Sequence, residues 1–172
     1  STAQIAAMTT SQVEKLTSAN AAVLGAEQVF AFTTEQVAKL STAAVAALNV
    51  NSVASMGTDQ LAALTTDQIR ALETEDFARL DDAQVGALTV DQVAKLETGD
   101  IGALDYRVDK FTTDQVQAMT TAHIAALSSD QVSGFSTEQL NALSTEQLVK
   151  ISTAAVARLT TAQMASMSST LL

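Results

Sequence analysis

The sequence predicts an all-α protein, an α-solenoid (superhelix) of very short helices with one helix in each eight-residue repeat. Octads run in unbroken phase through residues 1–104 and 112–167, and one seven-residue unit, residues 105–111, lies between them. Each octad also combines residues that favour the start of a helix with two apolar positions. A period this short and regular is typical of one small unit stacked on itself.

The start of each helix is encoded at the first and fourth positions of the octad. We label the positions a to h on a clean copy, residues 65–72, which reads TTDQIRAL. Position a holds Ser, Thr, Asp, Asn or Gly in nearly every octad, with Glu73 and Glu97 as exceptions, and these residue types favour a helix N-cap. Position d is mostly Gln, so a and d form a capping box that satisfies two backbone N–H groups. We therefore expect a helix to begin in every octad.

The apolar residues at e and h exclude the two competing architectures. On one continuous helix an eight-residue repeat would turn its apolar stripe by about 80° each time, so the stripe would not stay on one side. In a β-strand the spacing of three between e and h would place them on opposite faces. Short helices of about six or seven residues, joined at the h–a boundary, remain. Positions e and h should be the most buried and position c the most exposed.

The octads should form one continuous array over residues 1–172, since no Pro-rich, Gly/Ser-rich or charged linker interrupts them. A single octad buries too little apolar surface to fold alone, so its neighbours must share a core. In the seven-residue unit, Val108 and Phe111 keep the e and h positions. We interpret this unit as a tolerated deletion; the alternative is a binding feature that carries the only tyrosine, Tyr106.

The composition argues against several classes of partner. The net charge is −10, and the nine basic residues are scattered along the array instead of forming a stripe, so we expect no binding to nucleic acid or to an anionic membrane. No apolar run approaches the roughly 20 residues that span a bilayer, so we expect no membrane insertion. Ser1 enters the octad in phase without a signal peptide, and we interpret the chain as a segment of a longer array.

No catalytic, cofactor-binding or metal-binding residue is predicted, and we do not expect an enzyme. The only histidine, His123, replaces Gln at position d and should cap its own helix instead of acting as a base or ligand. Acidic residues gather between residues 73 and 109, where a calcium site is the alternative to helix capping. Their positions a, c and d favour capping, and neither an EF-hand nor a nonapeptide calcium repeat is present. These acids include Glu73, Glu75, Asp76, Asp81, Asp82, Asp100, Asp105 and Asp109.

One octad, residues 25–32, is an aromatic outlier. It carries Phe30 at position f in addition to Phe32 at position h. We expect Phe30 to face outward, either at a partner surface or under a neighbouring coil.

Two segments carry a resemblance to a known group of repeats. Residues 64–72 (LTTDQIRAL) and 119–127 (MTTAHIAAL) resemble the "LTTxQVxAL" octapeptide arrays of very large bacterial surface and secreted proteins, which are often described as adhesin-like. The resemblance covers essentially the whole chain. It implies a bacterial structural segment located outside the cell or on its surface.

The predicted function is a structural repeat module, a rod or superhelical spacer that self-associates end to end into a filament. The terminal octads motivate this, because we expect Ile5, Met8, Met164 and Met167 to expose the apolar face that internal octads bury, and an open head-to-tail contact produces a fibre. The alternative is an adhesin-type binding solenoid that recognises a protein, peptide or glycan. Positions c, f and g are mostly Ala, acid or Lys, which favours the structural module.

Overall fold

The structure is a computed structural model that describes residues 1–168, and these residues form helices without any strand. The predicted all-α solenoid with one short helix per octad is confirmed. Two compact units, Ser1–Leu88 and Thr89–Leu172, meet at a boundary between octads and are described separately. The single continuous array stays a prediction.

The helices follow the octads through both units. Unit 1 contains α1 (Thr2–Ala6), α2 (Thr10–Val13), α3 (Ser18–Ala22), α4 (Ala26–Phe30), α5 (Thr34–Val37), α6 (Thr42–Ala46), α7 (Val50–Ala54), α8 (Thr58–Ala63), α9 (Thr66–Arg70), α10 (Thr74–Arg79) and α11 (Asp82–Ala87). Unit 2 contains α12 (Val90–Val93), α13 (Thr98–Ala103), the 3₁₀ helix η1 (Asp105–Lys110), α14 (Thr113–Ala118), α15 (Thr121–Ala126), α16 (Ser129–Gly134), α17 (Thr137–Ala142), α18 (Thr145–Leu148), α19 (Thr153–Val156) and α20 (Thr161–Ser168).

The predicted capping box sets the start of the helices, as α9 illustrates. Thr65 has extended backbone angles and its Oγ1 accepts a hydrogen bond from the Gln68 N–H at 3.2 Å. In return Gln68 Oε1 accepts from the Thr65 N–H at 2.7 Å. The preceding helix ends because Leu64 is extended (φ −61°, ψ 135°) and its N–H bonds only three residues back, to the Leu61 carbonyl. This tight last turn makes such helices four to six residues long, shorter than expected.

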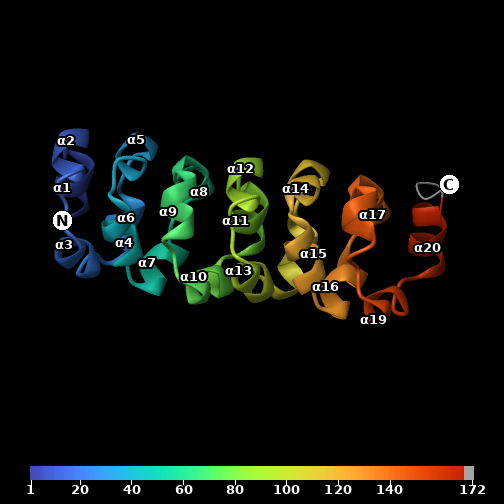
Figure 1. Ribbon diagram of the computed structural model, residues 1–172. Coiled ribbons are helices and arrows are strands. Elements are labelled where there is room, and N and C mark those ends of the chain that lie inside the picture. Colours follow the sequence, from blue (N-terminus) through green and yellow to red (C-terminus); the bar gives the residue numbers. More distant parts are fainter. Residues whose placement is uncertain (169–172) are drawn as a thin grey trace. The chain divides into compact units, whose positions relative to one another are not determined.

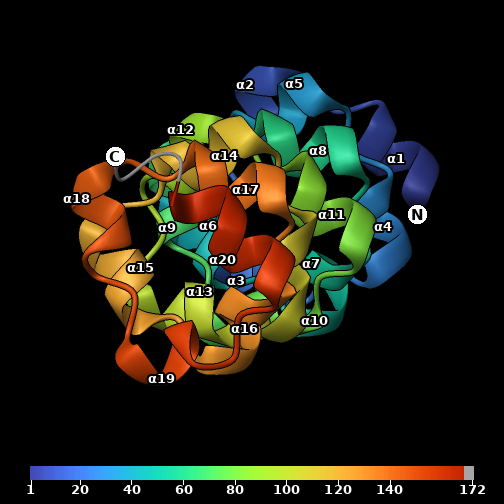
Figure 2. The same ribbon diagram turned by 90° about the vertical axis from the view of Figure 1, so that its right-hand side faces the viewer.

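Three octads complete one superhelical turn, because each helix packs on the helix three places further along. In unit 1, α1, α4, α7 and α10 form one column, while α2, α5, α8 and α11 form the second and α3, α6 and α9 the third. Figure 1 shows α2, α5 and α8 following one another along one edge of unit 1. Unit 2 repeats the arrangement, and α15 and α18 lie together at the left of Figure 2. One turn therefore spans three octads.

The core consists of the e and h side chains, as predicted. Position e is buried in every octad from Ile5 to Leu148, and position h in every octad from Leu24 to Ile151. Position c is exposed in every octad of residues 1–167, so the predicted register is confirmed. Position d is also buried in most octads from Gln36 onward, which the sequence analysis did not anticipate.

The expected exposure of the terminal apolar residues is wrong in part. Ile5 and Met167 are buried, because α1 packs on α4 and α20 packs on α17. Met8 is half-buried, and Met164 is the terminal apolar residue that is 43% exposed.

The seven-residue unit keeps its place in the superhelix. η1 packs on α16, three units further along, as an octad helix would. Val108 and Phe111 are buried, so the predicted e and h contacts are confirmed, and the interpretation as a tolerated deletion stays a prediction. The missing residue is accommodated at Asp105, which has a positive φ of 53°, and Arg107 Nε donates to the Leu104 carbonyl at 2.9 Å.

The backbone at Asp105 yields a testable prediction. Asp105→Gly should raise the free energy of unfolding by about 0.5–1 kcal/mol, because the left-handed conformation is costly for a residue with a Cβ and free for glycine. Chemical denaturation measures the change. Asp81→Gly is the control: Asp81 caps α11 at a negative φ of −84°, and its loss should lower stability. Equal effects of both substitutions would contradict the interpretation.

Candidate functional site

The glutamine at position d joins each turn of the superhelix to the preceding one. In α9, the Oε1 atom of Gln68 closes the capping box of its own helix. The Nε2 atom of the same amide donates to the carbonyl oxygens of Val37 at 2.9 Å and Leu40 at 2.6 Å, at the C-terminal end of α5 one turn below. Gln68 is 2% exposed, so its polar atoms exchange water for protein partners at both ends of the amide.

We call this set of contacts the glutamine ladder, and it recurs in both units. In each case Nε2 donates to the carbonyl of the h residue 28 positions earlier, at 2.6 to 2.8 Å. The pairs are Gln36 with Met8, Gln60 with Phe32 and Gln84 with Met56 in unit 1, and Gln139 with Phe111, Gln147 with Met119 and Gln163 with Phe135 in unit 2. Carbonyls that a helix leaves unsatisfied at its C-terminus thereby gain a donor.

The octad pattern predicts only one of the two roles of this glutamine. A capping box is served equally by Glu or Gln at its fourth position, because it needs only an acceptor. Glu never occupies position d in this sequence, although it is common elsewhere in the octad. That avoidance was the available signal, since a carboxylate can accept from its own helix but cannot donate to another.

Two octads replace Gln by other donors in the same place. His123 accepts the Thr120 N–H at Nδ1 (3.1 Å), and its Nε2 lies 2.9 Å from the Leu96 carbonyl. Because Nδ1 accepts, Nε2 carries the proton and donates, so His123 caps its own helix as predicted and also joins the ladder. Ser52 reaches the corresponding carbonyl in unit 1, donating from Oγ to Leu24 at 2.8 Å.

Asp76 is the acid that stands at position d in unit 1. Its Oδ2 accepts the Glu73 N–H at 2.9 Å, which closes the acceptor half of the capping box, and the residue is buried. Burial raises the pKa of Asp76 above its usual value; the hydrogen bond from Glu73 opposes the shift, and the nearby charges of Glu73 and Glu75 add to it. A carboxylate here lacks the donor that Gln supplies in neighbouring octads.

The remaining acids of residues 73–109 do not form a metal centre in the part of the chain described. No three His, Asp or Glu side chains within residues 1–168 are grouped so that they could hold a metal ion. Glu73, Glu75, Asp81, Asp82 and Asp105 are exposed, Asp109 is half-buried, and Asp100 is buried like Asp76. Within the same residues, no helix combines the length and the apolarity needed to cross a membrane.

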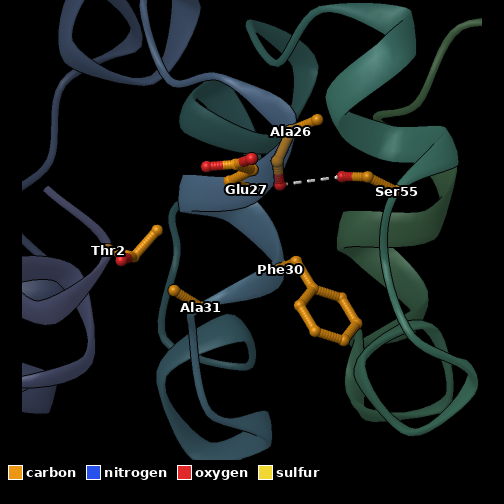
Figure 3. Close-up of a pocket in the computed structure, with 6 residues that line it drawn as sticks. All are labelled: Thr2, Ala26, Glu27, Phe30, Ala31 and Ser55. Atoms are coloured by element: carbon orange, nitrogen blue, oxygen red, sulfur yellow. Dashed lines mark hydrogen bonds between the residues drawn. The ribbon is translucent and has the colours of Figure 1, made fainter.

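Phe30 faces outward, in agreement with the sequence expectation, and it is 63% exposed. Figure 3 shows its ring projecting from α4 toward α7, on the far side of the helix from Thr2 of α1. The ring lines a hollow of about 430 Å³ together with Glu27 and Ser55. Ser55 Oγ lies 3.0 Å from the Ala26 carbonyl oxygen and 2.7 Å from the Ser52 carbonyl oxygen, so its one proton is shared between α4 and its own turn at the edge of this hollow.

Comparison with known proteins rests on the repeat itself. The profile described as the ALTTAQ repeat matches residues 42–74, 66–98, 108–145 and 136–169, which together make up more than half of the chain. The chain belongs to the ALTTAQ repeat family. Between the second and third matches lies the start of the irregular seven-residue unit. No curated protein matches the sequence.

The dual role of the ALTTAQ glutamine predicts a large difference between two chemically identical substitutions. Gln68→Glu keeps the cap acceptor but turns a carboxylate toward the Val37 and Leu40 carbonyls, so it should lower the free energy of unfolding by about 2 kcal/mol or more. Gln12→Glu in the dilute, monomeric chain is the matched control, because within one copy Gln12 is exposed and only closes its own capping box. Urea denaturation of both variants measures the difference, and equal losses would refute the ladder.

The raised pKa of Asp76 predicts a dependence of stability on pH. Since the folded-state pKa exceeds the unfolded one, protonation of Asp76 stabilises the fold at low pH, and this contribution is lost as the pH rises through the folded-state pKa. Asp76→Gln should therefore raise the melting temperature at pH 7, with a gain that shrinks as the pH falls. Thermal melts between pH 4 and pH 8 measure it; a gain independent of pH would contradict the assignment to Asp76.

Proposed function

We propose that this chain is a spacer in a bacterial cell-surface or secreted protein, and that copies of it join end to end through the glutamine ladder. The ALTTAQ repeats and their helical solenoid form a structural repeat module, which is the basis of the proposal. The resemblance to large bacterial surface proteins supports the location. The proposal assigns the chain no catalytic activity and no nucleic-acid or membrane partner.

The observation that carries the proposal is a set of unused donors in the first turn of unit 1. Gln4, Gln12 and Asn20 are exposed, and each accepts through its side-chain oxygen from the backbone N–H at position a of its own octad. Within residues 1–168, no acceptor pairs with their amide NH₂ groups. From Gln36 onward, the same amide donates to an earlier turn.

The last turn of unit 2 offers the complementary carbonyls. Gln163 donates to Phe135, and no side chain within residues 1–168 donates to the carbonyls of the next h residues, Leu143, Ile151 and Leu159. Suppose that a second copy continues the octads, with its Ser1 in the position that follows Met167. Gln4 of that copy would then lie 28 positions after Leu143, which is the spacing of the glutamine ladder. Gln12 and Asn20 would face Ile151 and Leu159 in the same way. Donors and acceptors therefore match in number and spacing.

The proposed register can be tested with two double variants, each of which introduces two Glu residues into the same two octads. The unmodified chain should associate with increasing concentration in sedimentation velocity. Gln4→Glu combined with Gln12→Glu should give a folded monomer, because carboxylates would face carbonyl oxygens across the junction. Ala3→Glu combined with Ser11→Glu adds the same charge at exposed c positions and should leave association intact.

Two further outcomes decide the proposal. In the proposed register the second copy follows Met167 directly, so deleting residues 168–172 should strengthen association. Of these, residues 169–172 lie outside the described part of the chain. A chain that is strictly monomeric near 1 mM in sedimentation or light scattering, with or without these residues, would refute end-to-end assembly and leave the passive spacer. Association that is equally weakened by both double variants would show that charge, and not the ladder, controls it.

A further inference from the structure

Phe30 stands at a position that carries a small residue in most other octads of unit 1. Position f is Ala in most octads of this unit, including Ala22, Ala38 and Ala46. Phe30 gains nothing from the core, since 63% of it is exposed. An aromatic ring held in solvent by a rigid helix is a common anchor for a binding partner.

The ring lines two surface hollows, and each hollow has an acidic residue in its wall. The first, of about 430 Å³, is lined by Phe30 and by Glu27 one turn earlier on α4, with Thr2 of α1 at its edge (Figure 3). The second, of about 310 Å³, is lined by Phe30, Gly57 and Asp59. Each of the two hollows that share this ring therefore contains one acidic residue.

Gly57 lines the second hollow beside the ring. Position a usually carries Ser or Thr, and here it is glycine at a negative φ of −68°, so the backbone does not require it. A Cβ at residue 57 would lie 3.7 Å from Cε2 of Phe30, in van der Waals contact with the ring. The large residue at position 30 thus stands opposite the smallest residue at position 57.

The chemistry of this surface fits a cation with a flat apolar face. The face of an aromatic ring attracts a guanidinium or ammonium group, and a guanidinium can stack on the ring while its edge bonds a carboxylate. Within the described residues, neither Glu27 nor Asp59 has a basic side chain within 4 Å. The net charge of −10 draws a basic partner toward the chain and repels an acidic one.

We propose that Phe30, Glu27 and Asp59 form a binding site for an arginine side chain of a basic peptide segment in a partner protein. The guanidinium stacks on the Phe30 ring and pairs with Glu27 or Asp59, while the hollows on either side accept the flanking residues of the peptide. This site lies on the outer side of α4, so its occupation is compatible with the glutamine ladder and independent of end-to-end assembly.

The test is a titration of the ¹⁵N-labelled chain with the peptide acetyl-Gly-Arg-Arg-Gly-amide, followed by NMR chemical shifts. Shifts should concentrate on residues 26–31 and 55–60, and binding should weaken with added salt. Phe30→Ala should lower the affinity about two- to fivefold, the loss expected for one exposed cation–π contact. This variant should fold normally because Ala occupies position f in neighbouring octads, and circular dichroism checks this. Phe30→Tyr should retain binding.

Two matched controls separate the site from the general acidity of the chain. Val149→Ala removes the exposed apolar residue at position f of an octad in unit 2, and Glu35→Gln removes an acidic residue at position c of the octad after α4. Neither should change the affinity, whereas Glu27→Gln should lower it. The proposal is overturned if Phe30→Ala binds as well as the unmodified chain, if Glu35→Gln and Glu27→Gln are equivalent, or if shifts spread evenly over the acidic positions.

Discussion

The amide of the position d glutamine is the contact on which this architecture depends. A helix of four to six residues consists almost wholly of ends, so most of its N–H and C=O groups lack partners within the helix. Such helices are unstable in isolation, because nucleation costs more than so few bonds return. Gln68 addresses both problems, since one planar group accepts from its own first turn and donates to the last carbonyls of another helix. The ladder thereby ties the local cap to the superhelix.

Packing around this contact explains the tolerance of the seven-residue unit. The superhelix requires each repeat to turn the chain and to contribute two buried side chains. It does not require a regular α-helix in each repeat. η1 supplies Val108 and Phe111 to the core. The strain of one missing residue is concentrated at Asp105. Gln131 adapts by donating to the Ile101 and Asp105 carbonyls at 3.0 and 3.1 Å, so the ladder continues past the irregularity.

Sequence reasoning identified the elements that depend on local chemistry. The cap at Thr65, the buried pair at e and h, and the exposure of c all follow from the octad itself, and the capping role of His123 follows from its position. The three octads per turn did not follow, because the rotation between helices is set by backbone angles at the h–a corner. For the same reason the second role of Gln68 was missed: its acceptors lie 28 and 31 residues away. The second hollow beside Phe30 is likewise lined by Gly57 and Asp59, which are distant in sequence.

The triangular winding gives the octad number an angular meaning within each unit. Residues in equivalent positions three octads apart share a column, as α4 and α7 do, whereas adjacent octads point a third of a turn away from each other. Insertion of one octad would therefore preserve every local contact and still rotate all later side chains to a different side. Insertion of three would restore the original azimuth. The surface pattern of such a chain therefore returns to the same side every three octads. The number of octads that precede a residue such as Phe30 determines the side of the superhelix on which that residue lies.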